Sequence, residues 1–352
     1  MSKPVVLLDP HPRRRRMILS DAQWTRLNVM AEVIEGSGDG PMSDAEVDAA
    51  LPRVSAVLGQ TALDARRLAA APLLRAIINV EGNFQPNVDY AACLRRGIEV
   101  LCVAPAFALP VAEMALGFAL DLARGITAGD RAMREGREQY GRAGNGEAIL
   151  LSRATIGLVG FGNLGRALGR LLAGFRPRIL IHDPWLPASA IRDEGFEPTA
   201  LNDVLRTAQV IFLLAGVTSD NPGFIDRTAL ATIADDSIVI LASRAAIVDF
   251  QALQDEARTG RLRIATDVFP QEPVAAGDPV RSSPMLLSAH RAGGIPAAFH
   301  DIGERTLDDL ELVLKGLPPV RLQRAQPQTV AMLRSTSGRG YSKDEEASLT
   351  SS

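Results

Sequence analysis

The sequence is poor in cysteine, in histidine and in net charge, and each shortage argues against a class of protein or site. Its 352 residues include two cysteines, Cys93 and Cys102, which are too few for a disulfide framework, so we predict a reducing compartment. No apolar run is expected to reach membrane-spanning length, and the first residues form a predicted strand without the pattern of a signal peptide. These absences predict a cytoplasmic protein without a membrane partner.

The formal net charge of −3 argues against a general nucleic-acid binder, because such proteins carry strongly basic surfaces. The chain has three lysines among its 38 basic residues, and the arginine run 13–16 is expected to be a solvated loop rather than an anion-binding patch. Histidine is also scarce. His11 and His182 have no metal-ligand spacing with other candidate ligands, so no metal site is predicted.

Strand-like and helical segments alternate through the first third of the chain. Helical patterns occupy Asp21–Ile34 and Asn87–Arg96, and the second stops at Gly97. Such alternation is typical of a parallel sheet with helices on its faces. The strands are predicted at Val5–Asp9, Val54–Leu58, Ala76–Val80 and Ile98–Val103.

The same alternation returns after residue 154, and disorder is predicted from Ser335 onward. Residues 130–147 are charged and glycine-rich, and we interpret them as a surface excursion. The length exceeds one ordinary core, so we predict an α/β fold with two doubly wound parallel-sheet domains. Further helices are predicted from Pro110 to about Arg124, at Phe250–Arg258 and at Ala297–Leu314. Further strands are predicted at Ile156–Val159, Ile179–Ile181, Val210–Leu214, Ser237–Ala242, Ile264–Val268 and Met285–Ala289.

A G-x-G-x-x-G turn between the first strand and helix of the second half predicts a dinucleotide site. Its first glycine permits the tight turn, its second lets backbone approach a pyrophosphate, and its third lets helix and strand pack closely. Asp183 ends the next strand, where its carboxylate can bind both ribose hydroxyls. That carboxylate would repel a 2′-phosphate, which favours NAD over NADP, although His182 and Arg178 weaken the preference. The turn consists of Gly160, Phe161, Gly162, Asn163, Leu164 and Gly165.

Four polar residues follow later strands, at the edge where parallel sheets bind ligands. Arg244 can hold a substrate carboxylate in a two-pronged contact and polarise the neighbouring carbonyl. His290 can exchange a proton with the forming alkoxide, and Glu272 can orient the imidazole. With Asp267, this set suits hydride transfer to a 2-oxo acid. His300 is the rival acid/base, but it lies in a helical pattern.

Three segments, 243–249, 267–273 and 288–293, resemble in order the arginine, Asp-Val-Phe-x-x-Glu-Pro and Pro-His-x-Ala-Gly motifs of the D-isomer-specific 2-hydroxyacid dehydrogenases. The resemblance is to the phosphoglycerate dehydrogenases and the glyoxylate and hydroxypyruvate reductases. It implies that Arg244 binds and polarises substrate, and that His290, paired with Glu272, is the acid/base. It also implies that Ala242, Ser243 and Asp267 lie at the cofactor, with Asp267 near the nicotinamide carboxamide.

The resemblance further implies a Rossmann cofactor domain, residues 115–294, inserted into a flavodoxin-like substrate domain formed by 1–114 and 295–334. Residues 335–352 would be a disordered tail. The loop expected to bind substrate reads Gly82-Asn83-Phe84 in place of Gly-x-Gly, so Phe84 is expected to reshape the pocket. With Phe107, it suggests an apolar or bulky substituent on the substrate rather than a phosphate. A homodimer is also implied.

Together these features predict an NAD-dependent oxidoreductase that interconverts a small D-2-hydroxy acid and its 2-oxo acid. The alternative is an NAD(H)-sensing binding protein that keeps the same scaffold without turnover, as transcriptional corepressors of this family do. Formate oxidation is disfavoured, because the resemblance would then demand glutamine where Glu272 stands. Phosphite oxidation stays open.

Overall fold

The computed structural model describes residues 3–38, 40–327 and 330, and contacts divide the chain into two units. Unit 1 contains residues 1–107 and those from 296 onward, and unit 2 is Ala108–Ile295. The predicted substrate and cofactor domains, with boundaries at 114 and 294, stay a prediction. The disorder predicted for 335–352 lies outside the described residues.

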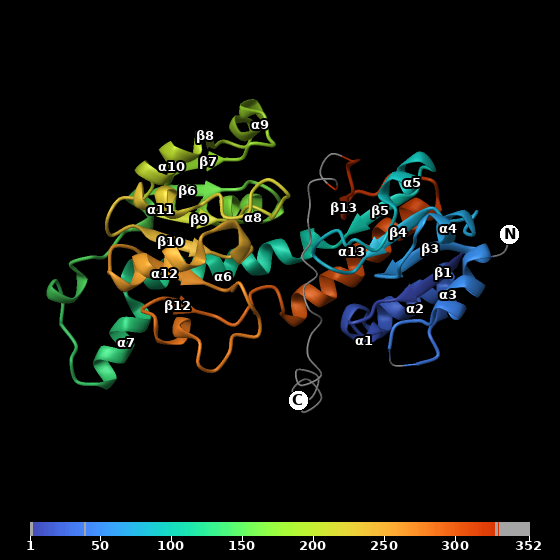
Figure 1. The fold of residues 1–352 in the computed structure, drawn as a ribbon, viewed down its shortest axis with the longest axis horizontal. Helices are drawn as coiled ribbons and strands as arrows, with labels where there is room; N and C mark the ends of the chain where they lie inside the picture. The colour runs from blue at the N-terminus through green and yellow to red at the C-terminus, as the bar shows by residue number, and fades with distance from the viewer. Residues whose placement is uncertain (1–2, 39, 328–329, 331–352) are drawn as a thin grey trace. The chain divides into compact units, whose positions relative to one another are not determined.

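Unit 1 is built on a six-stranded sheet in the order β13-β5-β4-β3-β1-β2 (Figure 1). Neighbouring strands are parallel except β13, which runs antiparallel to β5. The order β2-β1-β3-β4-β5 is that of flavodoxin-like sheets. The strands are β1 (Val5–Asp9), β2 (Glu32–Glu35), β3 (Val54–Gly59), β4 (Ala76–Asn79), β5 (Glu99–Cys102) and β13 (Gln323–Arg324).

The inner strands β1, β3 and β4 are apolar on both faces because helices cover both sides of the sheet. In β1, Val5 and Leu7 pack in one core cluster, and Val6 and Leu8 pack in another. This burial explains the continuous apolar runs from which the strands were predicted. The helices are α1 (Arg15–Ile18), α2 (Asp21–Met30), α3 (Asp44–Ala50), α4 (Ala65–Ala69), α5 (Tyr90–Arg95) and α13 (Pro296–Leu314), with a 3₁₀ turn at Leu51–Arg53.

The helix predicted over Asp21–Ile34 is wrong in its second part. Helix α2 starts at a capping box between Ser20 and Gln23 and ends at Met30, and residues 32–35 form β2. Val33 and Ile34 pair with β1 in parallel register. Their β-branched side chains suit a strand, and this pairing with a distant segment outweighs the local helical pattern.

Unit 2 contains a seven-stranded sheet, parallel throughout, in the order β12-β11-β10-β9-β6-β7-β8. The order reverses at β6, as in Rossmann folds. The predicted α/β fold with two doubly wound sheets is therefore confirmed. The strands are β6 (Thr155–Val159), β7 (Arg178–His182), β8 (Glu197–Pro198), β9 (Val210–Leu213), β10 (Ile238–Leu241), β11 (Arg263–Thr266) and β12 (Leu286–Leu287).

The helices of unit 2 include one, α6, that begins in unit 1 and crosses the division. They are α6 (Ala104–Arg124), α7 (Ile126–Arg134), α8 (Asn163–Leu172), α9 (Ala188–Asp193), α10 (Leu201–Thr207), α11 (Arg227–Ala231) and α12 (Phe250–Arg258). Short 3₁₀ turns occupy Ala143–Asn145, Leu151–Arg153, Ala245–Ile247 and Pro279–Ser282.

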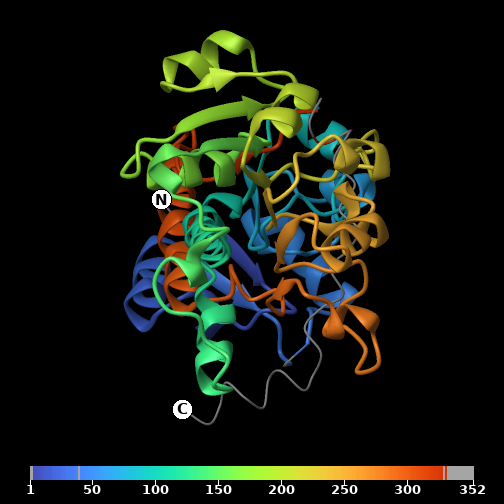
Figure 2. The ribbon, with the colours of Figure 1, turned by 90° about the vertical axis from the view of Figure 1, so that its left-hand side faces the viewer.

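One prediction about this region is wrong and another is incomplete. Helix α6 starts six residues before Pro110, which lies inside it. None of residues 130–147 is buried, as expected of a surface excursion, but the segment begins within α7, a helix without a buried residue that stands away from the sheet of unit 2 (Figure 2). Its polar composition hid its helical character, because no core contact imposes an apolar stripe.

Helix α6 is also long and apolar enough to cross a membrane by length and composition, contrary to our expectation for the sequence. Its buried residues offer another explanation, because they pack in the core of unit 2 beside strands β6 and β9. Core helices of soluble proteins pass the same test of length and composition. The residues are Ala112, Ala115, Phe118, Ala119 and Ala123.

Candidate active site

The turn between β6 and α8 carries the three glycines of the fingerprint. Gly160 has a φ of +102°, and a Cβ there would lie 2.6 Å from the backbone nitrogen of Ala215. A Cβ at Gly165 would lie 2.4 Å from the carbonyl oxygen of Gly160. The fold itself therefore requires glycine at both positions, because a side chain would collide with backbone.

Gly162 is different, because its neighbours do not require a glycine. Its φ of −75° suits any residue, and apart from the residues next to it in the chain no described residue has an atom within 4 Å of a Cβ placed there. Gly162 is the N-cap of α8, whose first N–H groups lack helical acceptors and attract anions. A glycine that the fold does not explain fits a backbone approached closely by a bound phosphate, and Asn163 and Leu164 open the same helix.

Asp183 follows β7 and is hydrogen-bonded to the glycine turn. Its Oδ2 accepts the N–H of Phe161 at 2.7 Å, and its Oδ1 accepts the N–H of Trp185 at 2.9 Å. Each oxygen keeps a lone pair for a ligand hydroxyl. Arg178 lies at the other end of β7 and is hydrogen-bonded twice to Glu197, so our expectation that it weakens the preference for NAD is wrong.

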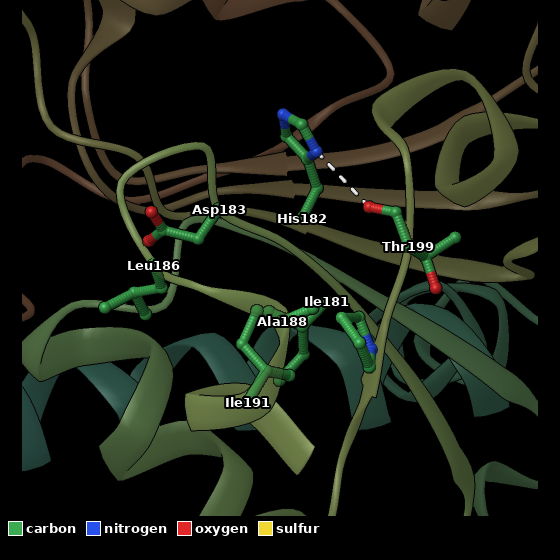
Figure 3. Close-up of a pocket in the computed structure, with 8 residues that line it drawn as sticks. Ile181, His182, Asp183, Leu186, Ala188, Ile191 and Thr199 are labelled. Carbon is green, nitrogen blue, oxygen red and sulfur yellow. Dashed lines mark hydrogen bonds between the residues drawn. The ribbon is translucent and has the colours of Figure 1, made fainter.

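A pocket of about 250 Å³ lies beside Asp183 (Figure 3). His182 borders it, with its Nδ1 3.3 Å from the carbonyl oxygen of Thr199. Apolar walls next to one carboxylate suit a flat ring that carries a hydroxyl-bearing substituent. The apolar lining consists of Ile181, Leu186, Ala188, Ile191 and Pro198.

The other predicted polar residues of unit 2 follow β10, β11 and β12, which are neighbours in the sheet. Arg244 lies three residues beyond β10, Asp267 directly follows β11, and His290 lies three residues beyond β12. Glu272 lies in the loop between β11 and β12. Because these strands are parallel, the side chains gather at the same edge of the sheet as the glycine turn.

His290 and Glu272 form a hydrogen-bonded pair. The imidazole Nδ1 lies 2.6 Å from Oε2 of Glu272, whose Oε1 accepts the N–H of Phe269 at 2.8 Å. Burial raises the pKa of the Glu272 carboxyl, but the hydrogen bonds from His290 and Phe269 and the charges of His290 and Arg244 outweigh it, so the pKa lies below its ordinary value. With Nδ1 engaged, Nε2 is the nitrogen suited to exchange a proton with a ligand.

Asp267 anchors the turn that follows His290. It is 2% exposed, and its carboxylate accepts the N–H groups of Arg291 and Ala292 at 3.1 and 3.0 Å. His290 has a φ of +48°, in the left-handed region that costs energy for a residue with a side chain. The two hydrogen bonds stabilise that conformation. Sequence analysis did not foresee this contact, because no motif signals it.

Ser243 and Arg244 are held by backbone carbonyls. The Ser243 hydroxyl, buried beside Ala242, donates to the carbonyl of Leu213 at 3.1 Å. Nη1 of Arg244 donates to the carbonyl of Ser243 at 2.7 Å, and the side chain is exposed. Among the described residues, no group of three or more His, Cys, Asp or Glu could hold a metal ion.

Gly82 and Asn83, the other predicted substrate-binding residues, belong to unit 1, in the loop after β4. Phe84 is 3% exposed and packs edge-on against Tyr90, with ring centroids 6.3 Å apart. Its ring therefore belongs to the core of unit 1, and the expectation that it reshapes a substrate pocket is wrong. The argument from Phe84 for an apolar substituent on the substrate therefore fails as well.

The arginine run 13–16 is only in part the solvated loop that we expected, because Arg14 and Arg16 are exposed but the other two arginines are not. Arg13 is buried and bonded to Glu81 in two places, at 2.9 and 2.8 Å. The guanidinium of Arg15 lies 4.3 Å from the ring centroid of Trp24. Runs of like charge are usually solvated, so the partners of these arginines become visible only in the fold.

Comparison with protein families gives one match over about half of the chain. The family described as D-isomer specific 2-hydroxyacid dehydrogenase, NAD binding domain, matches residues 116–292. The D-3-phosphoglycerate dehydrogenase of Mycobacterium tuberculosis is 30% identical over 281 residues, which cover 79% of this chain and 52% of that protein. The chain thus spans about half the length of the phosphoglycerate dehydrogenases that it matches.

Two further proteins match this chain over a larger share of their own length. The glyoxylate reductase of Pyrococcus furiosus is 27% identical over 260 residues, 72% of this chain and 77% of that protein. A crystal structure of a phosphoglycerate oxidoreductase from Rhizobium etli is 42% identical, with a TM-score of 0.84, and the match covers 92% of this chain and 99% of that one. Sequence and fold therefore lead to the same group of proteins.

Proposed function

Because this chain belongs to the D-isomer specific 2-hydroxyacid dehydrogenase family, we propose that it interconverts a small D-2-hydroxy acid and its 2-oxo acid with a nicotinamide cofactor. The observation that carries the proposal is the His290–Glu272 pair, 2.6 Å apart, at the sheet edge that also carries the glycine turn. An acid/base beside a dinucleotide site is what hydride transfer to a carbonyl needs.

The cofactor that we propose is NAD rather than NADP. The turn 160–165 would hold the diphosphate, and the unexplained Gly162 is the main support for this role. Asp183 would bind the ribose hydroxyls and would repel a 2′-phosphate, and the adenine ring would lie in the adjacent pocket. Ala242, Ser243 and Asp267 are the further residues proposed to lie at the cofactor.

The side chains of the site have separate roles in this proposal. When bound, the reduced nicotinamide supplies a hydride to the carbonyl carbon of the 2-oxo acid. Arg244 binds the substrate carboxylate and polarises the carbonyl. Gly82 and Asn83 are further residues to which we assign substrate binding. Nε2 of His290 donates a proton to the carbonyl oxygen as it becomes an alkoxide, and takes it back in the oxidation direction. Glu272 orients the ring and stabilises the imidazolium.

The proposal is tested by NADH oxidation with a panel of 2-oxo acids that includes glyoxylate and hydroxypyruvate. We expect turnover of at least one of them. His290→Ala should lower the turnover number by roughly 10²–10⁴-fold, because the acid/base is lost, and should leave NADH affinity unchanged. The matched control is His300→Ala, on α13 in unit 1, which should keep normal activity.

Two results would contradict the proposal in different ways. Near-normal activity of His290→Ala would remove the acid/base role of that residue. Tight NADH binding by the native protein without oxidation by any 2-oxo acid would instead favour the NAD(H)-sensing alternative.

We also propose a homodimer, on the basis of family membership. Helix α7 and the segment after it carry several exposed large apolar side chains, as subunit contacts do. Light scattering on the purified protein would show a single monomer mass if the proposal is wrong. These exposed apolar residues are Ile126, Met133, Tyr140 and Leu150.

A cytoplasmic location is likewise a proposal, supported by the unpaired Cys93 and Cys102.

A further inference from the structure

Arg13 is a buried arginine to which the proposed function gives no role. Its side chain is 6% exposed, and its Nε and Nη2 donate to the two carboxylate oxygens of Glu81 at 2.9 and 2.8 Å. A two-pronged contact of this kind is among the strongest that arginine forms, and it fixes both side chains. Glu81 directly precedes Gly82 and Asn83, so the ion pair fixes the start of the loop to which we assign substrate binding.

The same guanidinium contacts two aromatic rings. Its Cζ lies 5.5 Å from the ring centroid of Phe107 and 5.1 Å from that of Phe299, within the range of cation–π attraction. Nη1 is buried and has no hydrogen-bond partner among the described residues. The aromatic contacts are therefore the ones that offset the burial of that nitrogen.

The two phenylalanines lie where the chain passes from one unit to the other. Phe107 is the last residue of unit 1 before Ala108, and Phe299 is the fourth residue after Ile295, the last residue of unit 2. One side chain thus contacts both connecting segments, although these are almost two hundred residues apart in the sequence.

The loop and the first connecting segment also contact each other directly. A Cβ placed on Gly82 would lie 3.2 Å from Cδ2 of Phe107. The N–H of Val103, just before α6, donates to the carbonyl of Glu81 at 3.3 Å. Arg13 therefore lies at a point where three segments of unit 1 meet. It contacts one of them through the carboxylate of Glu81 and the other two through the rings of Phe107 and Phe299.

We propose that Arg13 is a positioning residue that holds the Gly82–Asn83 loop and both connecting segments as one rigid piece. This inference rests on the proposed function, because it assigns the loop to the substrate. A loop ordered in advance loses less conformational freedom when substrate binds. Without the Arg13 contacts the substrate must supply part of the order of this loop, which raises KM for the 2-oxo acid. NADH affinity, assigned to residues of unit 2, stays the same.

The variant that tests this inference is Arg13→Lys, which keeps the charge but loses the planar, two-pronged contact. We expect KM for glyoxylate or hydroxypyruvate to rise by about tenfold, the equivalent of one charged hydrogen bond, with a smaller change in kcat. Arg15→Lys is the matched control. Arg15 lies in the same part of the chain and has its own aromatic and acidic partners, Trp24 at 4.3 Å and Glu35 at 3.4 Å.

Hydrogen–deuterium exchange provides a readout that does not depend on activity. Arg13→Lys should speed amide exchange in residues 81–84, 103–107 and 299–302 together, and Arg15→Lys should not. Exchange that changes only next to position 13, or a KM equal to that of Arg15→Lys, would overturn the inference. Should Arg13→Lys fail to fold, Glu81→Gln removes the partner charge with little change of shape and is measured in the same way. Absence of turnover in the native protein would count against the proposed function, and the exchange data would still decide on the coupling.

Discussion

The two sheets follow a similar plan but end their first strands differently. In unit 1, β1 ends at Asp9, whose carboxylate is 7% exposed and accepts the backbone N–H of Met42 and the hydroxyl of Thr61. In unit 2, β6 ends at the glycine turn, where Gly162 has open space beside its backbone. The chain's own groups close the first turn, whereas the second has open space beside Gly162, at the start of α8. The fold is shared, so the turn residues decide which edge can bind a nucleotide.

The strongest test of this comparison is Gly59→Ala in unit 1. Gly59 has a φ of +138°, and a Cβ there would lie 1.8 Å from the carbonyl oxygen of Asp9. We expect the free energy of unfolding to fall by about 3 kcal/mol, because backbone must move. Urea denaturation measures the loss. An unchanged midpoint would show that the edge of unit 1 is less closely packed than the structure indicates.

The second test is Gly162→Val in unit 2, which should have the opposite pattern. The free energy of unfolding should fall by no more than about 1 kcal/mol, the cost of a poor N-cap residue, because the φ of −75° and the open space tolerate a side chain. The dissociation constant of NADH should rise by about a hundredfold, because the side chain fills the place of the phosphates. Fluorescence titration with NADH provides the measurement. Full NADH affinity in this variant would remove the main support for the nucleotide turn.

A third test compares two buried carboxylates that hold loops, Asp9 and Asp267. Asp267→Asn turns one acceptor into a donor opposite the N–H groups of Arg291 and Ala292, so the turn after His290 should loosen. We expect kcat to fall by about tenfold, roughly the worth of one charged hydrogen bond. Asp9→Asn should lower stability and leave kcat unchanged. If Asp267→Asn instead weakens NADH binding alone, the contact that matters is with the cofactor.

The smallest expected effect is a pH dependence at Glu272. Its pKa lies below its ordinary value of 4.5, so in the folded protein it adds stability above that pH and loses the contribution as the pH falls further. The native protein should therefore be more stable than Glu272→Gln at neutral pH, and the difference should shrink below about pH 4. Denaturant titrations across this range test it. If the difference in stability between the two proteins stays constant with pH, the contact with His290 does not lower the pKa of the Glu272 carboxyl.

Much of unit 2 could be predicted because its signals are local. The turn 160–165, the acid at 183 and helix Phe250–Arg258 each lie within a short stretch whose spacing determines the structure. Strand β2 and the partners of Arg13 could not, because they depend on segments distant in sequence. The anchoring of the His290 turn by Asp267 belongs to the same class. Long-range contacts override local preference, and no residue pattern reports them.

The hydrogen bond from the Phe161 N–H to Asp183 has a practical consequence for coenzyme engineering. The carboxylate that we propose to bind the ribose also accepts a hydrogen bond from the turn that we propose to bind the diphosphate. A change to serine or arginine at 183, intended to admit a phosphorylated ribose, would thus also remove the hydrogen bond that holds this turn. A new acceptor for the N–H of Phe161 must be designed together with the new selectivity.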